Sequence, residues 1–187
     1  MKYLSGLLLL VTLNAYAEKA DRTKPMAVEA EVANLSQGSD KTDIRTLEGN
    51  VEITQGTLHV VADRLVMKEN KDGLRFMEAF GKPLSPVSLK QKREGLNDFV
   101  EAHAERLEFD ERTDTIKLFT QAWAKSGSNE LHGEYIIYNT ATEAIEVKGS
   151  APGTKAGEKP GRAKFVIYPK KADDASNKSA PDSSAKP

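Results

Sequence analysis

Apolar and polar residues alternate along most of the chain beyond its first segment, most clearly on either side of Gly56. Val51 and Ile53 alternate with polar residues before this glycine, and Leu58 and Val60 resume the alternation after it. A period of two interrupted by a glycine predicts two half-buried β-strands joined by a tight turn.

The alternation changes parity a few residues later, at Ala62-Asp63. The next apolar residues, Leu65 and Met67, occupy odd positions, whereas the two before the change occupy even ones. A slip of one residue turns every later side chain to the opposite face of a sheet. A bulge or corner at Ala62-Asp63 would restore a single apolar face, so the stretch predicts a bent, antiparallel, one-sided sheet.

A short motif with this parity change recurs along the chain. It consists of a small residue, a mostly acidic one, and apolar residues three and five positions after the small one. Its five copies, spaced roughly 30 to 40 residues apart, begin at Ala30, Ala62, Ala104, Gly133 and Ala163. Such near-regular copies predict stacked hairpin units. Because helical periodicity is weak throughout, the fold class predicted is all-β.

The two ends of the chain differ from its middle. Residues 1–17 resemble a secretory signal peptide, with Lys2, a leucine-rich core too short to span a bilayer, and a small-x-small site at Ala15-Tyr16-Ala17. Residues 169–187 are mostly polar residues, alanine and proline, which cannot form a core. We therefore expect one β domain over residues 18–168, followed by a disordered tail.

Composition excludes several classes of function. The formal net charge is −1, aromatic residues are 6% of the chain, and cysteine is absent. The dispersed basic residues give no nucleic-acid footprint, and no disulfide or cysteine chemistry is available. No Ser/His/Asp signature for nucleophilic catalysis is visible. We expect a protein that is not an enzyme, with no cofactor and no catalytic residues.

His103 and His132 are the only candidates for a metal site. Each stands just before a copy of the motif and two residues before a glutamate. Equivalent residues of neighbouring units can lie on adjacent strands, so a metal site is conceivable. Placement on a polar surface is the simpler interpretation, and we expect no metal. A metal-dependent hydrolase on this face is the enzymatic alternative.

The stretch 90–98 contains a basic cluster of Lys90, Lys92 and Arg93. It lengthens the second step of the repeat, and we expect a solvated insertion there. Contact of these cations with lipid head-group phosphates is the alternative.

The block Gly49-Asn50-Val51-Glu52-Ile53-Thr54-Gln55-Gly56, followed by Ala62-Asp63 and later by Gly81-Lys82-Pro83, resembles the OstA-like family of periplasmic lipopolysaccharide-transport proteins of Gram-negative envelopes. The resemblance extends from Lys24 to Tyr168. One departure is Thr120-Gln121, where the family repeats Gly-Asn. The resemblance implies an open, V-shaped β-jelly roll that carries lipopolysaccharide towards the outer membrane and needs no cofactor.

The resemblance also implies that the apolar face holds the acyl chains of lipid A. From the sequence alone an ordinary closed core explains the same pattern, and a strand-stacking envelope protein without lipid cargo is the alternative function. The candidate lipid-binding residues are Met26, Val28, Leu35, Val51, Ile53, Leu58, Val60, Leu65, Met67, Leu107, Phe109, Leu118, Leu131 and Ile136.

The first and last strands of an open sheet have unpaired backbone groups. We expect these strands at Met26 to Leu35 and at Ala163 to Tyr168. Phe165, Val166, Ile167 and Tyr168 form an apolar run suited to strand addition by a partner. Copies of the chain are therefore expected to stack head to tail. The resemblance further implies that LptC binds at the N-terminal edge and LptD at the C-terminal edge.

Overall fold

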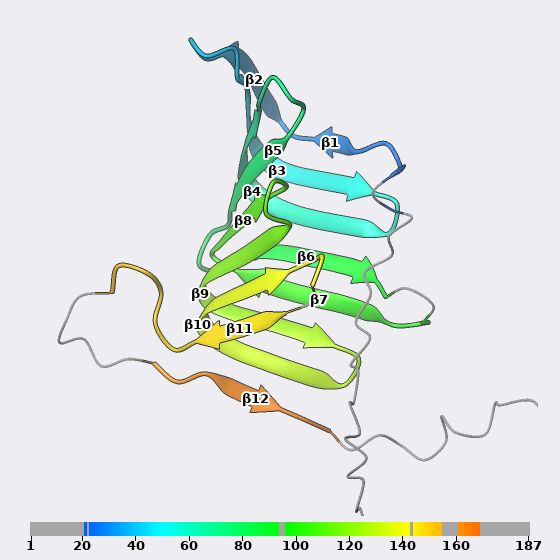
Figure 1. The fold of residues 1–187 in the computed structure, drawn as a ribbon, viewed down its shortest axis with the longest axis vertical. Coiled ribbons are helices and arrows are strands. Elements are labelled where there is room, and N and C mark those ends of the chain that lie inside the picture. Colours follow the sequence, from blue (N-terminus) through cyan, green and yellow to red (C-terminus); the bar gives the residue numbers. More distant parts are fainter. Residues whose placement is uncertain (1–20, 22, 94–95, 143, 155–160, 169–187) are drawn as a thin grey trace, which may run out of the picture.

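The computed structural model describes residues 21, 23–93, 96–142, 144–154 and 161–168, which form one antiparallel sheet of twelve strands. The predicted signal peptide and tail lie outside the described residues. In Figure 1 the strands follow one another along the long axis, from β1 and β2 at one end to β11 and β12 at the other. The strands are β1 Ala27–Glu29, β2 Val32–Gln37, β3 Asp43–Gln55, β4 Leu58–Glu69, β5 Arg75–Phe80, β6 Val87–Lys92, β7 Phe99–Ala104, β8 Arg106–Asp110, β9 Thr115–Ser126, β10 Asn129–Asn139, β11 Ile145–Lys148 and β12 Lys164–Val166. Among the described residues no helix is long and apolar enough to span a bilayer.

The sheet divides into two halves because its strands change partners midway. Residues 64–69 of β4 pair with β5, whereas residues 59–61 pair with β6. The long strands β3, β4, β9 and β10 run through both halves. We call the half with β2, β5, β8 and β11 the β5 half, and the half with β1, β6, β7 and β12 the β6 half. The halves pack on one shared core, which makes the fold an open, V-shaped β-jelly roll, as predicted.

Two-residue bulges lie where the long strands pass from one half of the sheet to the other. We call this line the crease. Gly49 and Asn50 have φ of 77° and 44°, and the register of β3 and β4 shifts at this point. Thr120 and Gln121 of β9 repeat the conformation with φ of 64° and 50°. The corner predicted at Ala62-Asp63 is thus present, but the additional residue that forms it lies on β3, the paired strand.

The acidic residue of the motif stabilises a neighbouring bulge. The backbone N–H of Glu31 donates to Gly49 O at 3.0 Å, and its carboxylate accepts from Asn50 Nδ2. The carboxylate of Glu134 accepts from the backbone N–H of Gln121 at 3.5 Å. The charge is therefore placed where a bulge leaves backbone or amide donors unpaired.

The small residue of the motif occupies the inside of the crease. Ala62 and Ala104 are buried, and a Cβ added to Gly133 would lie 2.8 Å from Lys148 O. A larger side chain at this level would push the two halves apart.

The fifth copy of the motif, at Ala163, does not stand at the crease, so the repeat predicted there is wrong. The first four copies stand at the crease and lead into the β5 half, whereas Lys164 pairs with His132 in the β6 half. The chain leaves the β5 half after β11, at Gly149. A Cβ added to Gly149 would lie 1.8 Å from Gly161 O, so only glycine fits there.

Three strand predictions also required correction. Residues 87–92 form β6, which the sequence interpretation missed, so Lys90 and Lys92 belong to a strand and not to an insertion. The expected first strand is broken at Ala30-Glu31, and the copy of the motif that begins at Ala104 contains a break at Glu105, between β7 and β8. Both breaks fall at the crease, where strands change partners.

Replacing Thr120 with glycine should stabilise the protein by about 0.5–1 kcal/mol. A β-branched residue in the left-handed region is strained by roughly 1–2 kcal/mol, and the conformational entropy of glycine offsets part of the gain. The midpoint of urea unfolding measures the effect. Thr46→Gly, in the regular part of β3, is the matched control and should destabilise. A loss of stability at both positions would refute the strain at Thr120.

Candidate functional site: an apolar groove between the two halves

The inner face of the β5 half consists of apolar rows that cross every strand. Partners in register form a first row, and a second row lies nearer the open side of the V. The first row contains Leu47, Leu65, Ala79, Leu107, Leu118 and Ile136, and the second contains Met67, Met77, Phe109, Ile116 and Tyr138.

A matching row crosses the inner face of the β6 half. It contains Val28, Ile53, Val60, Leu89, Ala102, Ala124, Leu131 and Phe165. The fifth copy of the motif predicts Val166 and Tyr168 on the inner face, but pairing with Leu131 places Phe165 there instead. The apolar surface therefore continues to the last strand.

Burial separates the candidate lipid-binding residues into a floor and a lining. The floor is fully packed and holds the halves together, as an ordinary core does. It contains Val51, Ile53, Val60, Leu65, Met67, Leu107, Leu118 and Ile136. Met26, Val28, Leu58, Phe109 and Leu131 are partly buried against this floor, and Leu35 is 74% exposed. The two interpretations of the pattern, closed core and open groove, thus apply at different depths.

An open cleft of about 320 Å³ lies at the β1 and β2 end of the groove. It is lined by Met26, Val28, Ala33, Asn34, Leu35, Arg45, Leu47, Met67, Glu69 and Arg75. Met26, which is only partly buried, supplies flexible, polarisable surface that adapts to irregular apolar ligands, and Met67 lies beneath it in the packed floor.

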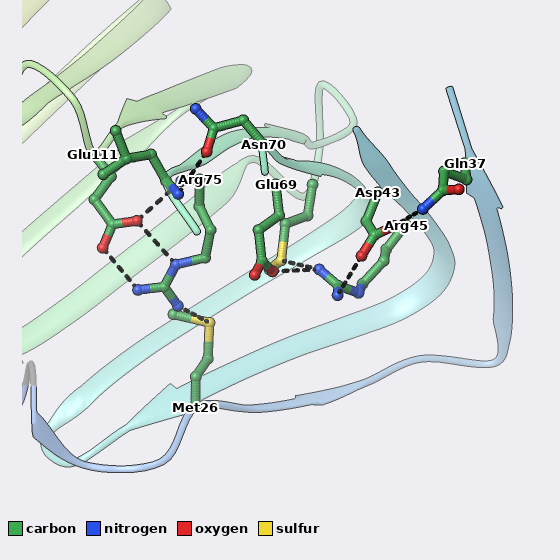
Figure 2. A network of polar contacts seen from close by, with 10 residues as sticks. Met26, Gln37, Asp43, Arg45, Glu69, Asn70, Arg75 and Glu111 are labelled. Atoms are coloured by element: carbon green, nitrogen blue, oxygen red, sulfur yellow. Dashed lines mark hydrogen bonds and ion pairs between the residues drawn. The ribbon is translucent and has the colours of Figure 1, made fainter. Parts of the chain in front are cut away.

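Charged residues border this cleft (Figure 2). Arg75 donates to Glu111 through Nε at 3.1 Å, through Nη2 at 2.9 Å and through its backbone N–H at 3.0 Å. The pKa of Arg75 is raised, chiefly by its side-chain hydrogen bonds with Glu111. Arg45 Nη1 donates to Glu69 Oε2 at 2.8 Å. Sequence reasoning missed this border, although Arg45 shares the odd parity of the buried residues on β3.

The charged border of the cleft differs in its side chains from the opposite edge of the groove. We call that edge, at the end of β3 and along β6, the lip of the β6 half. There the side-chain amide of Gln55 donates to Lys24 O at 2.9 Å, and Gln91 donates to Asp21 at 3.2 Å. This lip combines neutral amides with the Lys24–Asp21 ion pair, whereas guanidinium and carboxylate groups form the border of the β5 half.

Asp21 is a buried acidic residue that sequence reasoning did not single out. It is 1% exposed and accepts hydrogen bonds from Thr57, Gln91 and Lys24. Burial acts to raise the pKa of Asp21, but these hydrogen bonds together lower it. Asp21 thereby connects the segment before β1 to the β3–β4 turn and to β6.

His103 and His132 lie on the outer face of the β6 half, apart from the groove. Trp123 of β9 is the register partner of both histidines and so lies between them. The Trp123 ring stacks on the His103 ring, with 4.8 Å between the two ring centroids. The pKa of His103 is lowered, first by burial and then by His132. Within the described residues no group of three or more histidine, cysteine or acidic side chains is placed to hold a metal ion.

The basic side chains of residues 90–93 belong to the β6–β7 hairpin. Lys90 pairs with Glu101 at 3.0 Å and lies 4.4 Å from the Phe99 ring centroid. Arg93 pairs with Asp98 at 2.8 Å. These side chains stabilise the β6–β7 hairpin and do not border the cleft.

Each end of the sheet has two short edge strands, one from each half. At one end β1 and β2 both pair with β3, and at the other β11 and β12 both pair with β10. Phe165, Ile167 and Tyr168 are more than half exposed, and Val166 is partly buried. Only Lys164–Val166 is regular strand, so the edge run extends beyond β12.

An open β-jelly roll whose apolar inner face runs from the first strand to the last has a groove suited to an apolar ligand. A family model described as LptA/(LptD N-terminal domain) LPS transport protein matches residues 27–144, and the chain belongs to this family.

Individual relatives agree with the family match. The lipopolysaccharide export system protein LptH of Pseudomonas aeruginosa is 28% identical over 158 residues, which cover 84% of this chain and 86% of LptH. The export protein LptA of Escherichia coli K12 is 23% identical over 177 residues, covering 94% and 88% of the two chains. The crystal structure of LptH, described as the LptA-homologous periplasmic component of the lipopolysaccharide transport device, has a TM-score of 0.68. It is 26% identical and covers 80% of this chain and 99% of that one.

Proposed function

We propose that the protein carries lipopolysaccharide through the periplasm from the inner-membrane to the outer-membrane machinery, shielding lipid A acyl chains in its groove. The observation that carries this proposal is the unbroken apolar row from Val28 on β1 to Phe165 on β12. A groove that is apolar from the first strand to the last suits a ligand that enters at one end and leaves at the other.

The depth of the groove suits transient binding. Each methylene removed from water contributes about 0.8 kcal/mol, so complete burial of several acyl chains would approach the limit of reversible affinity. Here the floor is already packed by side chains such as Val51 and Leu65. Only the lining remains for ligand, which favours shallow contact and release to the next protein.

The two ends of the sheet suit strand addition. In this proposal LptC pairs at the β1 and β2 end, LptD pairs at the β11 and β12 end, and copies of the chain stack head to tail. Stacking would place the row ending at Phe165 next to Val28 of the following copy, which continues the groove. The signal peptide, residues 1–17, and the tail, residues 169–187, would take no part in binding.

Photo-crosslinking tests lipid carriage. A photo-reactive residue at Val28 or Leu131, on the lining, should crosslink to lipopolysaccharide in cells. One at Glu52 or Arg64 should not, because Glu52 and Arg64 lie on the outer face, where Arg64 pairs with Glu48 at 3.2 Å. Equal labelling of both faces would contradict carriage within the groove.

A further inference from the structure

Two guanidinium groups at the cleft direct hydrogen-bond donors at thioether sulfurs. Arg75 Nη1 lies 3.8 Å from Met26 Sδ, and Arg45 Nη1 lies 3.8 Å from Met67 Sδ. Figure 2 shows Arg75 between Glu111 and the sulfur of Met26, and Arg45 between Glu69 and Asp43. A thioether is a weak acceptor, so both cations have donor capacity that a stronger acceptor in the cleft would use.

Ion pairs with carboxylates fix the positions of both arginines. Arg75 is held by Glu111 at three donor atoms. Arg45 is held by Glu69 at 2.8 Å and lies 3.8 Å from Asp43. Asp43 in turn accepts from Gln37 Nε2 at 3.0 Å. In Arg75 the anchored donors are Nε, Nη2 and the backbone N–H, so Nη1 is the donor that faces the cleft. In Arg45 one nitrogen, Nη1, faces both Glu69 Oε2 and Met67 Sδ, and its second N–H is the donor available to the cleft.

The position of these arginines matches the polarity of an amphiphile. From the crease outwards, the inner face of the β5 half passes from small buried alanines through Leu65 and Met67 to the charged border. Acyl chains that enter between the lips bring the attached head group to the level of this border. Among the residues that the structure describes, Arg45 and Arg75 are the cations that line the cleft, and each is less than 35% exposed.

We propose that Arg45 and Arg75 form an anion subsite for the phosphate groups of the lipid head group, at the β1 and β2 end of the groove. The proposal rests on the proposed function and adds the group that determines the orientation of the lipid. Charge-assisted contacts with phosphate oxygens would replace the contacts with sulfur.

The carboxylates keep this subsite weak. Asp43, Glu69 and Glu111 outnumber the two arginines and compete with a phosphate for the same donors. A phosphate can therefore be bound and released without a large change of structure, as transfer between successive proteins requires.

Lipid binding by the full mature chain tests the subsite. The probes are lipid A with both phosphates and the same lipid A after enzymatic removal of its phosphates. For Arg75→Gln and for Arg45→Gln, affinity for the phosphorylated lipid should fall tenfold or more. Affinity for the dephosphorylated lipid should stay within twofold of the unmodified protein.

Two controls separate the subsite from folding. Arg64→Gln removes an arginine of the outer face and should change neither affinity. Arg75→Gln combined with Glu111→Gln removes the ion pair without leaving a charge unpaired, and should show the same selective loss with an unchanged urea midpoint. An excess of inorganic phosphate should not compete with the lipid, because phosphate without acyl chains gains no apolar contact.

The possible outcomes distinguish the two proposals. If the unmodified protein binds both lipids equally well, lipid carriage stands and the phosphate subsite is wrong. If the variants lose affinity equally for both lipids, the arginines only support the cleft. Competition by inorganic phosphate would instead assign the site to free phosphate, and failure to bind either lipid would overturn lipid carriage as well.

Discussion

Replacing Leu65 with aspartate is expected to unfold the protein, with a loss of more than about 4 kcal/mol in the free energy of unfolding. Leu65 is 1% exposed and lies in the row that joins β3, β4 and β5. A carboxylate there has no hydrogen-bond donor prepared for it, and burial of an unpaired charge is among the costliest substitutions. Circular dichroism combined with urea unfolding measures the effect.

The matched control is Val61→Asp on the same strand. Val61 is 36% exposed on the outer face, so a carboxylate there remains hydrated. Its partner Glu52 adds a repulsion of about 1 kcal/mol or less. A folded Leu65→Asp protein with a urea midpoint like that of the control would show that the floor of the groove is not a packed core.

Replacing Ile167 with proline should abolish concentration-dependent self-association while the monomer stays folded. The backbone N–H of Tyr168 donates to Asn129 Oδ1 at 3.4 Å and therefore points towards β10. Successive N–H groups of an extended chain alternate in direction, so the N–H of Ile167 points to the open edge. Ile167 is 78% exposed, and its loss removes little packing. Sedimentation over a range of concentrations measures the association.

The neighbouring substitution provides the comparison. By the same alternation the N–H of Val166 points towards β10, so Val166→Pro removes an internal hydrogen bond and should detach β12 as well. Oligomers of Ile167→Pro identical to those of the unmodified chain would show that copies do not pair through this edge.

Much of the fold was predictable because the alternation of apolar residues reports directly which face of a strand is buried. The parity change after Val60 predicted a corner, and Leu65 and Met67 are indeed buried on the same side as Val60. The pattern did not show that the additional residue lies in β3, because one strand carries no record of its partner's register. Thr120 and Gln121 hid a second bulge, since neither residue type favours positive φ.

The polar parts of the site were harder to predict. Lys90 was assigned to an insertion because a run of charges looks like a solvated loop. Its partner Glu101 lies on another strand and became visible only through the pairing of β6 with β7. Arg75 was overlooked for the same reason, because Glu111 and Met26 approach it from distant parts of the chain. Ion pairs of this kind depend on tertiary structure, which local periodicity does not encode.

The number of strands sets the length of the groove. Neighbouring strands lie about 4.8 Å apart, and eight strands follow one another along the sheet from β1 to β11, so one copy spans about 34 Å of groove by that spacing. One further hairpin would add about 10 Å to this span without altering the crease. The length of groove in one copy is therefore set by the number of strands and not by the number of residues.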